Sequence, residues 1–444
     1  MKIAILGSVA LPVPPPAQGV TEWIAYFQAM GLAKRGHKVL LFAAYGSKTG
    51  DYELIEVGKG DTVVGSKQAL ESSIQRIPSE SSIPNSSDNP PSGKSDSLLP
   101  ISSTNLGSGT IGRGRYSELV SSDLSQQRDI NIESSRGLRK ENVYLGEVIE
   151  QLIKRKDDYD VILNNMRGEA VLLPVAKLLD KPFVNVMHLP LFPELAEAFK
   201  TYNTNIITIS NAQRKGFTDL NYLATVNNCV DTEKFVVSTK SEIRNPNVET
   251  NSNDQNSKNS NISNFDICAS DLNSDYILMM GTIGRHKNQA GAIRIAKETG
   301  MKLVLAGKIR DQDYFEELKK DIDGIQIKWV GEMGFEKKLK LYQNAKVFIF
   351  PILWEEPFGL VMIEAMACGV PVVAYNNGAI PEVVVNGVNG FVIESGNEKE
   401  MISAVKNIGI IKREDCRKYV EEHFTVEKMV ADYEKALSNL TLNI

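Results

Sequence analysis

The feature that most constrains this chain is a repeated alternation of short, wholly apolar segments with longer amphipathic segments. A short apolar run bounded by turn residues is typical of a strand buried on both faces, as in a parallel sheet covered by helices. The alternation occurs in two runs, which a segment rich in Asn and Ser separates. We therefore predict an α/β protein with two doubly wound parallel-sheet domains.

The first run predicts helices over Val20–Lys34, Val143–Lys156, Glu169–Leu179 and from Pro193, and strands over Lys2–Gly7, Lys38–Ala43, Val161–Asn164, Phe183–Met187, Ile206–Ile209 and one ending near Val226. The second run predicts helices from near Lys287, Asp313, Phe335, Leu360 and Pro381, and strands over Tyr276–Gly281, Lys302–Ala306, Ile325–Val330, Val347–Phe350, Pro371–Tyr375 and Phe391–Ile393.

Two polar segments set the expected domain boundaries. Glu71–Thr110 contains 13 Ser and 5 Pro, and Ser238–Asn264 contains 8 Asn and 6 Ser, with no aromatic residue in either. Such compositions cannot bury enough apolar surface to offset the entropy of ordering them. We expect an amino-terminal domain over 1–232 with a low-complexity insertion at about 66–138, a linker over 233–274, a second domain over 275–425, and a carboxyl-terminal helix over 426–444 that can cross back to the first domain.

Charge and cysteine content exclude several classes of protein. The chain has 50 Lys and Arg against 55 Asp and Glu, a net charge of −5, which argues against a nucleic-acid binder. Its four cysteines are scattered without a CxxC pair, so we expect neither a zinc site nor a disulfide framework. The sequence has no apolar run long enough for a membrane-spanning helix, and the first apolar residues are typical of a strand, so we expect a cytoplasmic protein.

The densest group of candidate site residues follows the predicted strand Val347–Phe350. Pro357 and Gly359 favour a turn before a helix that begins near Leu360. The free N–H groups of a helix start bind phosphate, and in a doubly wound sheet ligands bind at the carboxyl ends of the strands. Glu356 lies in the loop and Glu364 on the helix, and a carboxylate can accept hydrogen bonds from two vicinal hydroxyls. These features together indicate a nucleotide-sugar site, which we expect in a cleft between the domains.

This segment resembles the signature of the family 4 retaining glycosyltransferases, whose E-x7-E motif matches Glu356 and Glu364. The segments Gly369–Ala374 and Gly378–Phe391 also follow that family's pattern. The resemblance covers nearly the whole chain outside the two polar segments. It implies a GT-B fold, in which two facing Rossmann-like domains bind the acceptor on the amino-terminal side and the nucleotide sugar on the carboxyl-terminal side.

The resemblance also assigns roles to residues around the glutamate pair. Glu356 would face the hydroxyls of the donor sugar, and Glu364 would face the ribose of the nucleotide. The backbone around Phe358, Gly359 and Leu360 would hold the sugar and the diphosphate.

Further donor-binding residues follow from the segment Gly281–Gln289. Lys287 fits the family's lysine for the diphosphate, where an ammonium acts as a point charge. Thr282 stands where the family usually has an arginine, so Arg285 could reach the phosphates instead or simply lie on the surface. Val330 lies in the segment that holds the nucleotide base in the family.

The amino-terminal half carries weaker matches. Gly19 fits the family's glycine-rich loop, although Val20 replaces its second glycine. His188 ends a predicted strand and resembles the family's active-site histidine, with a hydrogen-bonded loop histidine as the alternative interpretation. Asn165 replaces a more usual histidine, and Cys229 replaces a glycine and is expected to be a packing residue.

The function that the resemblance implies is transfer of a sugar from a nucleotide-diphosphate sugar, UDP-sugar above all, to an acceptor hydroxyl with retention of the anomeric configuration. The expected activity is hexosyltransferase-like, with Glu356, His188 and Lys287 as catalytic residues, without a cofactor or a metal. The acceptor would be a sugar, a glycan, a lipid-linked molecule or a small molecule, and peripheral contact with a membrane is compatible with the family. Two alternatives stay open: a sugar-nucleotide epimerase of the same architecture, and a non-catalytic nucleotide-sugar-binding homologue.

Overall fold

The structure is a computed structural model of the 444-residue chain, and it describes residues 1–8, 11–15, 19–58, 136–238 and 275–441. Nearly all of the two polar segments, and with them the expectations for the insertion and the linker, lie outside these residues. One compact unit, formed by Met1–Gly60 and Tyr144–Ile444, contains both sheets. The expected domain boundaries stay a prediction.

The first sheet has seven parallel strands in the order β3-β2-β1-β4-β5-β6-β7. Ile3 in β1 pairs with Val39 in β2 and with Val161 in β4, so the first strand of the chain lies in the interior of the sheet. The strands are β1 Lys2–Leu6, β2 Lys38–Ala43, β3 Glu53–Glu56, β4 Val161–Asn164, β5 Phe183–Met187, β6 Asn205–Thr208 and β7 Tyr222–Thr225.

The second sheet has six parallel strands in the order β10-β9-β8-β11-β12-β13. Its first strand in sequence, β8, lies between β9 and β11, which places the carboxyl ends of β8 and β11 next to each other. The strands are β8 Tyr276–Met280, β9 Lys302–Ala306, β10 Ile327–Trp329, β11 Val347–Phe350, β12 Val372–Tyr375 and β13 Gly390–Ile393.

Helices connect the strands of both sheets. Residues 136–154 are also helical. The short 3-10 helices η1 Ala212–Arg214, η3 Arg285–Lys287 and η4 Ile408–Ile410 lie in the loops. The α-helices are α1 Val20–Lys34, α4 Glu169–Leu178, α5 Pro193–Thr201, α7 Gln289–Thr299, α8 Gln312–Lys319, α9 Phe335–Asn344, α10 Leu360–Ala367, α11 Ile380–Val383, α12 Glu398–Lys406, α13 Arg413–His423 and α14 Val426–Thr441.

Alternate residues of β1 supply the cores on the two faces of the first sheet. Ile3 and Ile5 belong to the core cluster that includes Ile24 and Leu32 of α1. Ala4 and Leu6 belong to a second cluster, which includes residues of the helix over 136–154, of α4 and of α5. Because successive strand side chains point to opposite faces, an apolar strand such as β1 needs helices on both sides.

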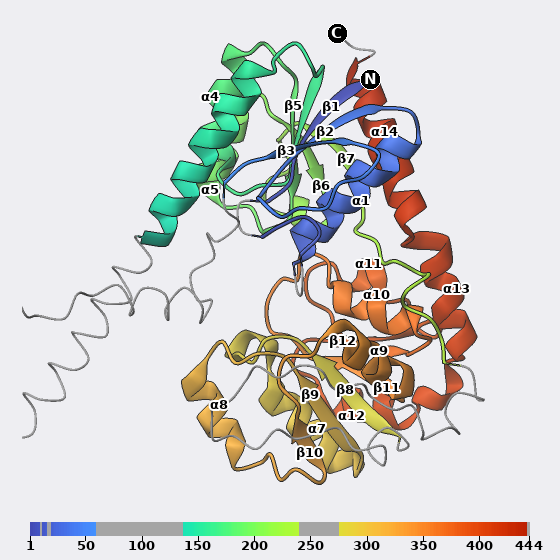
Figure 1. Cartoon of the computed structure of the whole chain (residues 1–444). Helices are drawn as coiled ribbons and strands as arrows, with labels where there is room; N and C mark the ends of the chain where they lie inside the picture. Colours follow the sequence, from blue (N-terminus) through green and yellow to red (C-terminus); the bar gives the residue numbers. More distant parts are fainter. Residues whose placement is uncertain (9–10, 16–18, 59–135, 239–274, 442–444) are drawn as a thin grey trace, which may run out of the picture. The chain divides into compact units, whose positions relative to one another are not determined.

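The last helix, α14, packs along α1 (Figure 1). Gly31 of α1 leaves room for Val430, since a Cβ at Gly31 would lie 2.3 Å from the Val430 Cγ2 atom. Glu434 of α14 accepts hydrogen bonds from Arg35 Nε at 2.7 Å and from His37 Nε2 at 2.8 Å. His37 is therefore a structural residue of this helix pair.

The predicted fold class is confirmed, because both sheets are wholly parallel and connected by helices. The prediction missed the edge strand β3 and the helices α12 and α13. It also placed a helix start near Lys287, whereas α7 begins at Gln289 because the Asn288 side chain caps the helix by accepting a hydrogen bond from Gly291 N. Among the described residues, no helix combines the length and the hydropathy that a bilayer-crossing segment requires.

Candidate functional site

Glu356 lies in the loop between β11 and α10, and two donors hold one of its carboxylate oxygens. Glu356 Oε2 accepts hydrogen bonds from Lys287 Nζ at 3.1 Å and from Trp354 Nε1 at 3.0 Å. The side chains of Glu356 and Lys287 are 12% and 15% exposed, so their ion pair is largely shielded from water. A shielded pair of this kind holds the carboxylate in one orientation.

Lys287 reaches Glu356 from the neighbouring strand of the sheet. It ends η3, in the loop after β8, and β8 pairs with β11. Its ammonium group also lies 4.9 Å from the ring centroid of Trp354 and 5.4 Å from that of Phe350. Aromatic faces attract a cation and leave its N–H donors available. The structure thus brings Glu356 and Lys287 together at the carboxyl edge of the second sheet.

The turn before α11 fixes the backbone of Glu356. Gly378 has φ +61°, and a Cβ there would lie 2.3 Å from the Glu356 carbonyl oxygen and 2.4 Å from its nitrogen. Ala379 N donates a hydrogen bond to the Glu356 carbonyl at 2.8 Å. Gly378 N donates to the Glu355 carboxylate at 2.8 Å. A glycine at position 378 is therefore required both by its left-handed backbone and by this close approach.

Glu364 lies on α10 and is paired with two side chains of α9. Lys338 Nζ donates to Glu364 Oε1 at 2.8 Å, and the Tyr342 hydroxyl donates to Oε2 at 2.8 Å. Burial, and secondly the charge of Glu364, raise the pKa of Tyr342 well above its ordinary value, so this hydroxyl stays a donor. Lys338 and Tyr342 are thus the partners that a carboxylate in an apolar helix needs. Since each oxygen has a further lone pair, the carboxylate can still accept from a ligand hydroxyl.

The start of α10 is built by Phe358, Gly359 and Leu360. Gly359 has φ +88° and precedes the first helical residue. Phe358 is buried, with its ring centroid 5.7 Å from that of Phe424. The first N–H groups of any α-helix lack partners within the helix, so this helix start can bind an anion.

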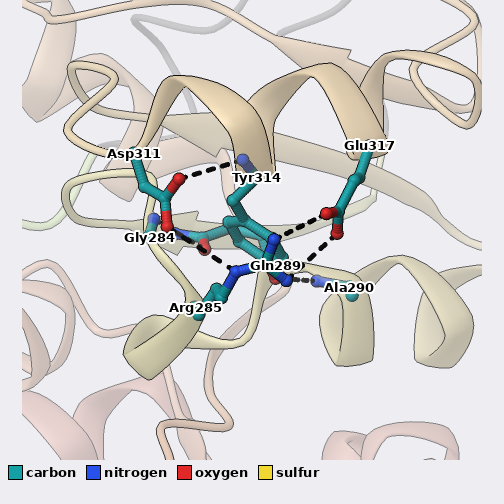
Figure 2. A network of polar contacts seen from close by, with 7 residues as sticks. All are labelled: Gly284, Arg285, Gln289, Ala290, Asp311, Tyr314 and Glu317. Carbon is teal, nitrogen blue, oxygen red and sulfur yellow. Dashed lines mark hydrogen bonds and ion pairs between the residues drawn. The ribbon is translucent and has the colours of Figure 1, made fainter. Parts of the chain in front are cut away.

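Arg285 forms ion pairs with acidic side chains around α8, as Figure 2 shows. Its guanidinium donates to both carboxylate oxygens of Glu317, at 3.1 and 2.5 Å, and lies 3.8 Å from an oxygen of Asp311. It also stacks over Tyr314, 5.1 Å from the ring centroid. The hydrogen bond from Arg285 lowers the pKa of the Glu317 carboxyl. The Arg285 side chain is 58% exposed. That Arg285 reaches the phosphates stays a prediction.

Hydrogen bonds to the backbone hold Thr282 and Val330, two further donor-binding candidates. The Thr282 carbonyl accepts a hydrogen bond from Gln289 Nε2 at 3.0 Å, and Gln289 Oε1 accepts from Gly284 N at 3.3 Å. Val330 N donates to the Leu305 carbonyl at 2.9 Å. These bonds fix the loops that follow β8 and β10.

In the amino-terminal sheet, His188 follows β5 and contacts Asn165, which follows β4. His188 Nε2 lies 2.9 Å from Asn165 Oδ1, and Asn165 Nδ2 donates to Gln28 Oε1 at 2.7 Å. Burial lowers the pKa of His188 to about 4, so the imidazole is neutral at pH 7. That His188 shares one site with Glu356 and Lys287 stays a prediction.

Gly19 precedes the first residue of α1 in an extended conformation, φ 171°. A Cβ at this position would lie 2.7 Å from both Glu22 Oε2 and Pro15 Cγ, so local packing alone already requires glycine. The phosphate contact expected of Gly19 stays a prediction. Cys229 is buried, and burial raises the pKa of its thiol, which agrees with a packing residue rather than a nucleophile.

Several residues of these contacts were not anticipated from the sequence. Trp354 is two positions before Glu356, so its proximity could have been noticed. Lys338 and Tyr342 are four residues apart, on one face of α9, a spacing that also could have been noticed. Gln28 and Asn165 meet only through the fold, and no local pattern indicates them. Within the described ranges, no three His, Cys, Asp or Glu side chains lie close enough together to hold a metal ion.

The two parallel α/β sheets, of seven and six strands, match the GT-B class of fold seen in solved structures. Residues 262–423 match the family model described as glycosyl transferases group 1, and the resemblance stated from the sequence is confirmed.

Curated relatives match over limited lengths. An uncharacterized glycosyltransferase of Methanocaldococcus jannaschii is 33% identical over 138 residues, which are 30% of this chain and 35% of that protein. The N-acetyl-alpha-D-glucosaminyl L-malate synthase of Bacillus anthracis is 40% identical over 88 residues, 18% of this chain and 23% of that enzyme. The alignments thus span about a quarter to a third of the length of these relatives.

Solved structures match over nearly the whole chain and establish the fold. The Anabaena protein HepE in complex with UDP and glucose superposes with a TM-score of 0.60 at 16% identity, over 99% of both chains. A sucrose-phosphate synthase from Thermosynechococcus elongatus superposes with a TM-score of 0.61 at 15% identity, over 100% of both chains.

Proposed function

We propose that this chain is a retaining glycosyltransferase that transfers a sugar from a UDP-sugar to an acceptor hydroxyl without a metal ion. The observation that carries the proposal is the shielded pair of Glu356 and Lys287 at the carboxyl edge of the second sheet, next to the start of α10. The match of residues 262–423 to group 1 glycosyltransferases supports it. The UDP and glucose bound to the HepE protein support UDP as the nucleotide.

The contacts of Lys287 suit a leaving diphosphate. An ammonium group has three N–H donors, and Glu356 accepts one of them. The remaining donors, together with the N–H groups at the start of α10, can stabilise the charge that develops on the diphosphate as the bond to the sugar breaks. This arrangement supplies positive charge at the leaving group from the protein alone.

Glu356 and His188 serve the sugar in this proposal. Glu356 Oε2 is held by Lys287 and Trp354, so the carboxylate is fixed in orientation before it meets a sugar hydroxyl. His188 is neutral and can exchange a hydrogen bond with a hydroxyl. Glu364, held by Lys338 and Tyr342, would accept from the ribose hydroxyls.

The proposed acceptor is a sugar, a glycan, a lipid-linked molecule or a small molecule, bound on the side of the amino-terminal sheet. Large exposed apolar side chains follow His188 at Leu189 and Phe192, and they favour an acceptor with an apolar portion or a peripheral membrane contact. The proposed site of action is the cytoplasm.

The experiment is a screen of purified protein against UDP-, GDP- and ADP-sugars, by thermal shift and by release of the nucleotide. We expect a UDP-sugar to stabilise the protein, and Glu356→Ala to lose most of the turnover. Glu398→Gln is the control, since Glu398 of α12 forms an ion pair with Arg294 of α7 that is more exposed than the pair of Glu356 and Lys287. Full activity of Glu356→Ala would contradict the assignment. Interconversion of the donor sugar in the absence of any acceptor would favour the epimerase instead.

A further inference from the structure

Three polar side chains from three different elements form a continuous chain in the amino-terminal domain. Gln28 comes from α1, Asn165 follows β4 and His188 follows β5. Gln28 is 0% exposed and Asn165 is 3% exposed. The two hydrogen bonds that join them measure 2.7 Å, between the amides, and 2.9 Å, between Asn165 and the imidazole.

The direction of these bonds determines where the imidazole carries its proton. Asn165 Nδ2 donates to Gln28 Oε1, so Asn165 Oδ1 is the atom that faces His188 Nε2. In this orientation of the Asn165 amide, its oxygen accepts the hydrogen bond and Nε2 of His188 carries the hydrogen. Burial lowers the pKa of His188 and keeps the ring neutral, so Nδ1 has a lone pair and no hydrogen.

His188 Nδ1 is buried, and no described residue hydrogen bonds to it. A buried acceptor without a partner costs free energy, and native proteins leave few such atoms unless a ligand or a water molecule completes them. Nδ1, on the other side of the ring from Nε2, thus lacks a donor that a ligand or a water molecule could supply.

We propose that Asn165 and Gln28 are positioning residues that hold His188 in its Nε2–H tautomer, so that Nδ1 accepts a hydrogen bond from a hydroxyl of the sugar substrate. That the donor to Nδ1 is a sugar hydroxyl rests on the proposed function, whereas the tautomer of His188 does not. At position 165 the family 4 glycosyltransferases, which this chain resembles, more often have a histidine. The pair of Asn165 and Gln28 is therefore a feature of this chain rather than of that family's pattern.

The tautomer can be measured directly, without substrate. The chain has four histidines, and protein labelled with 15N at histidine gives separate imidazole nitrogen signals by NMR. The His188 signals are assigned as those that disappear in His188→Gln. We expect the proton of His188 to reside on Nε2 at pH 7.5. A proton on Nδ1 in the unsubstituted protein would overturn the proposal.

The Gln28→Met variant tests the positioning role. It keeps the volume of the side chain but removes the acceptor that orients the Asn165 amide, so we expect a mixture of the two tautomers and about a tenfold loss of kcat/KM, the scale of one lost hydrogen bond. Asn185→Leu is the matched control. It removes a different buried amide contact, between Asn185 and Asn164 at 2.7 Å, that does not involve His188. We expect Asn185→Leu to keep the Nε2–H tautomer.

The outcomes separate this proposal from the proposed function. An unchanged tautomer and unchanged turnover in Gln28→Met would refute the positioning role even if the protein transfers sugars. A protein that turns over no nucleotide sugar would refute the proposed function and the role of the substrate hydroxyl, while the NMR measurement would still decide the tautomer. If Gln28→Met fails to fold, the tautomer of the unsubstituted protein still decides between the two arrangements.

Discussion

At the scale of single residues, the charges at the carboxyl edge of the second sheet are arranged in pairs. Glu356 pairs with Lys287, and Glu364 pairs with Lys338. The side chains in both pairs are at most 20% exposed, so breaking a pair leaves a poorly solvated charge behind. The same residues that would contact the donor therefore also contribute to the stability of the fold.

Glu364→Gln should weaken donor binding more than it slows turnover. The substitution removes the counter-charge of Lys338 but leaves the carboxylates near the sugar in place. We expect an increased KM for the donor with a smaller change in kcat, and a loss of about 1–3 kcal/mol in the free energy of unfolding. Steady-state kinetics and urea unfolding measure the two effects. Asp275→Asn, which breaks an exposed pair with Lys346, should change neither the KM nor the free energy of unfolding. An unchanged KM in Glu364→Gln would refute the contact of Glu364 with the ribose.

His188 makes stability depend on pH. Burial lowers its pKa from 6.5 to about 4, so between these values the unfolded chain binds a proton that the folded chain does not. Neutral His188 contributes about 2–3 kcal/mol to the free energy of unfolding. This contribution is fully present above about pH 6.5 and is lost as the pH falls towards 4. His188→Gln should remove this part of the pH dependence in urea unfolding at pH 7.5 and 4.5. His423→Gln, at an exposed histidine of α13, should retain it. If the free energy of unfolding changed equally between pH 7.5 and 4.5 in the unsubstituted protein and in His188→Gln, the buried neutral state of His188 would be contradicted.

What sequence reasoning captured at this scale depended on distance along the chain. Glu356 and Glu364 were found because they belong to one continuous motif, and Lys287 because the family pattern fixes its spacing. Arg285 was left open, since its partners Glu317 and Asp311 on α8 become neighbours only when η3 folds beside that helix. The contact between Asn165 and Gln28 was missed because 137 positions separate them.

At the scale of elements, the loop that carries Glu356 is held by the turn before α11. Gly378→Ala should displace this loop, because the added Cβ would overlap the Glu356 backbone. We expect kcat/KM to fall by about a hundredfold. Gly387→Ala is the matched control, since Gly387 also has a positive φ, +78°, but a Cβ there meets nothing within 4 Å. It should lose only about 1–2 kcal/mol of stability from backbone strain and keep its activity. Similar activity in the two variants would show that the contact with Glu356 is unimportant.

The elements that sequence reasoning found are those with a clear apolar signal. Strands β2, β5, β9 and β11 match their predicted bounds, because each is a buried run between turns. The edge strand β3, Glu53–Glu56, was missed because only Ile55 in it is buried and both of its ends are charged. The helix α13, Arg413–His423, was missed because its residues are mostly charged and only Cys416 and Val420 are buried.

At the scale of the whole molecule, the net charge of −5 is compatible with a ligand that carries only a diphosphate. Lys287 and the start of α10 can supply the local positive charge, so we expect sugar transfer to persist in EDTA. The measurement is product formation with EDTA and then with added magnesium. Loss of turnover in EDTA that magnesium restores would show that a metal takes part, and a chelator-insensitive rate would agree with the proposal.

The packing of α14 on α1 has a consequence for how this protein is made. Residues 20–34 are translated well before the helix that packs on them, Val426–Thr441. At roughly 5–20 residues per second, the interval is on the order of 20 to 80 s. During that time the surface around Gly31 lacks Val430 and its neighbours. A nascent chain must therefore keep this apolar helix face from aggregating until α14 has been translated.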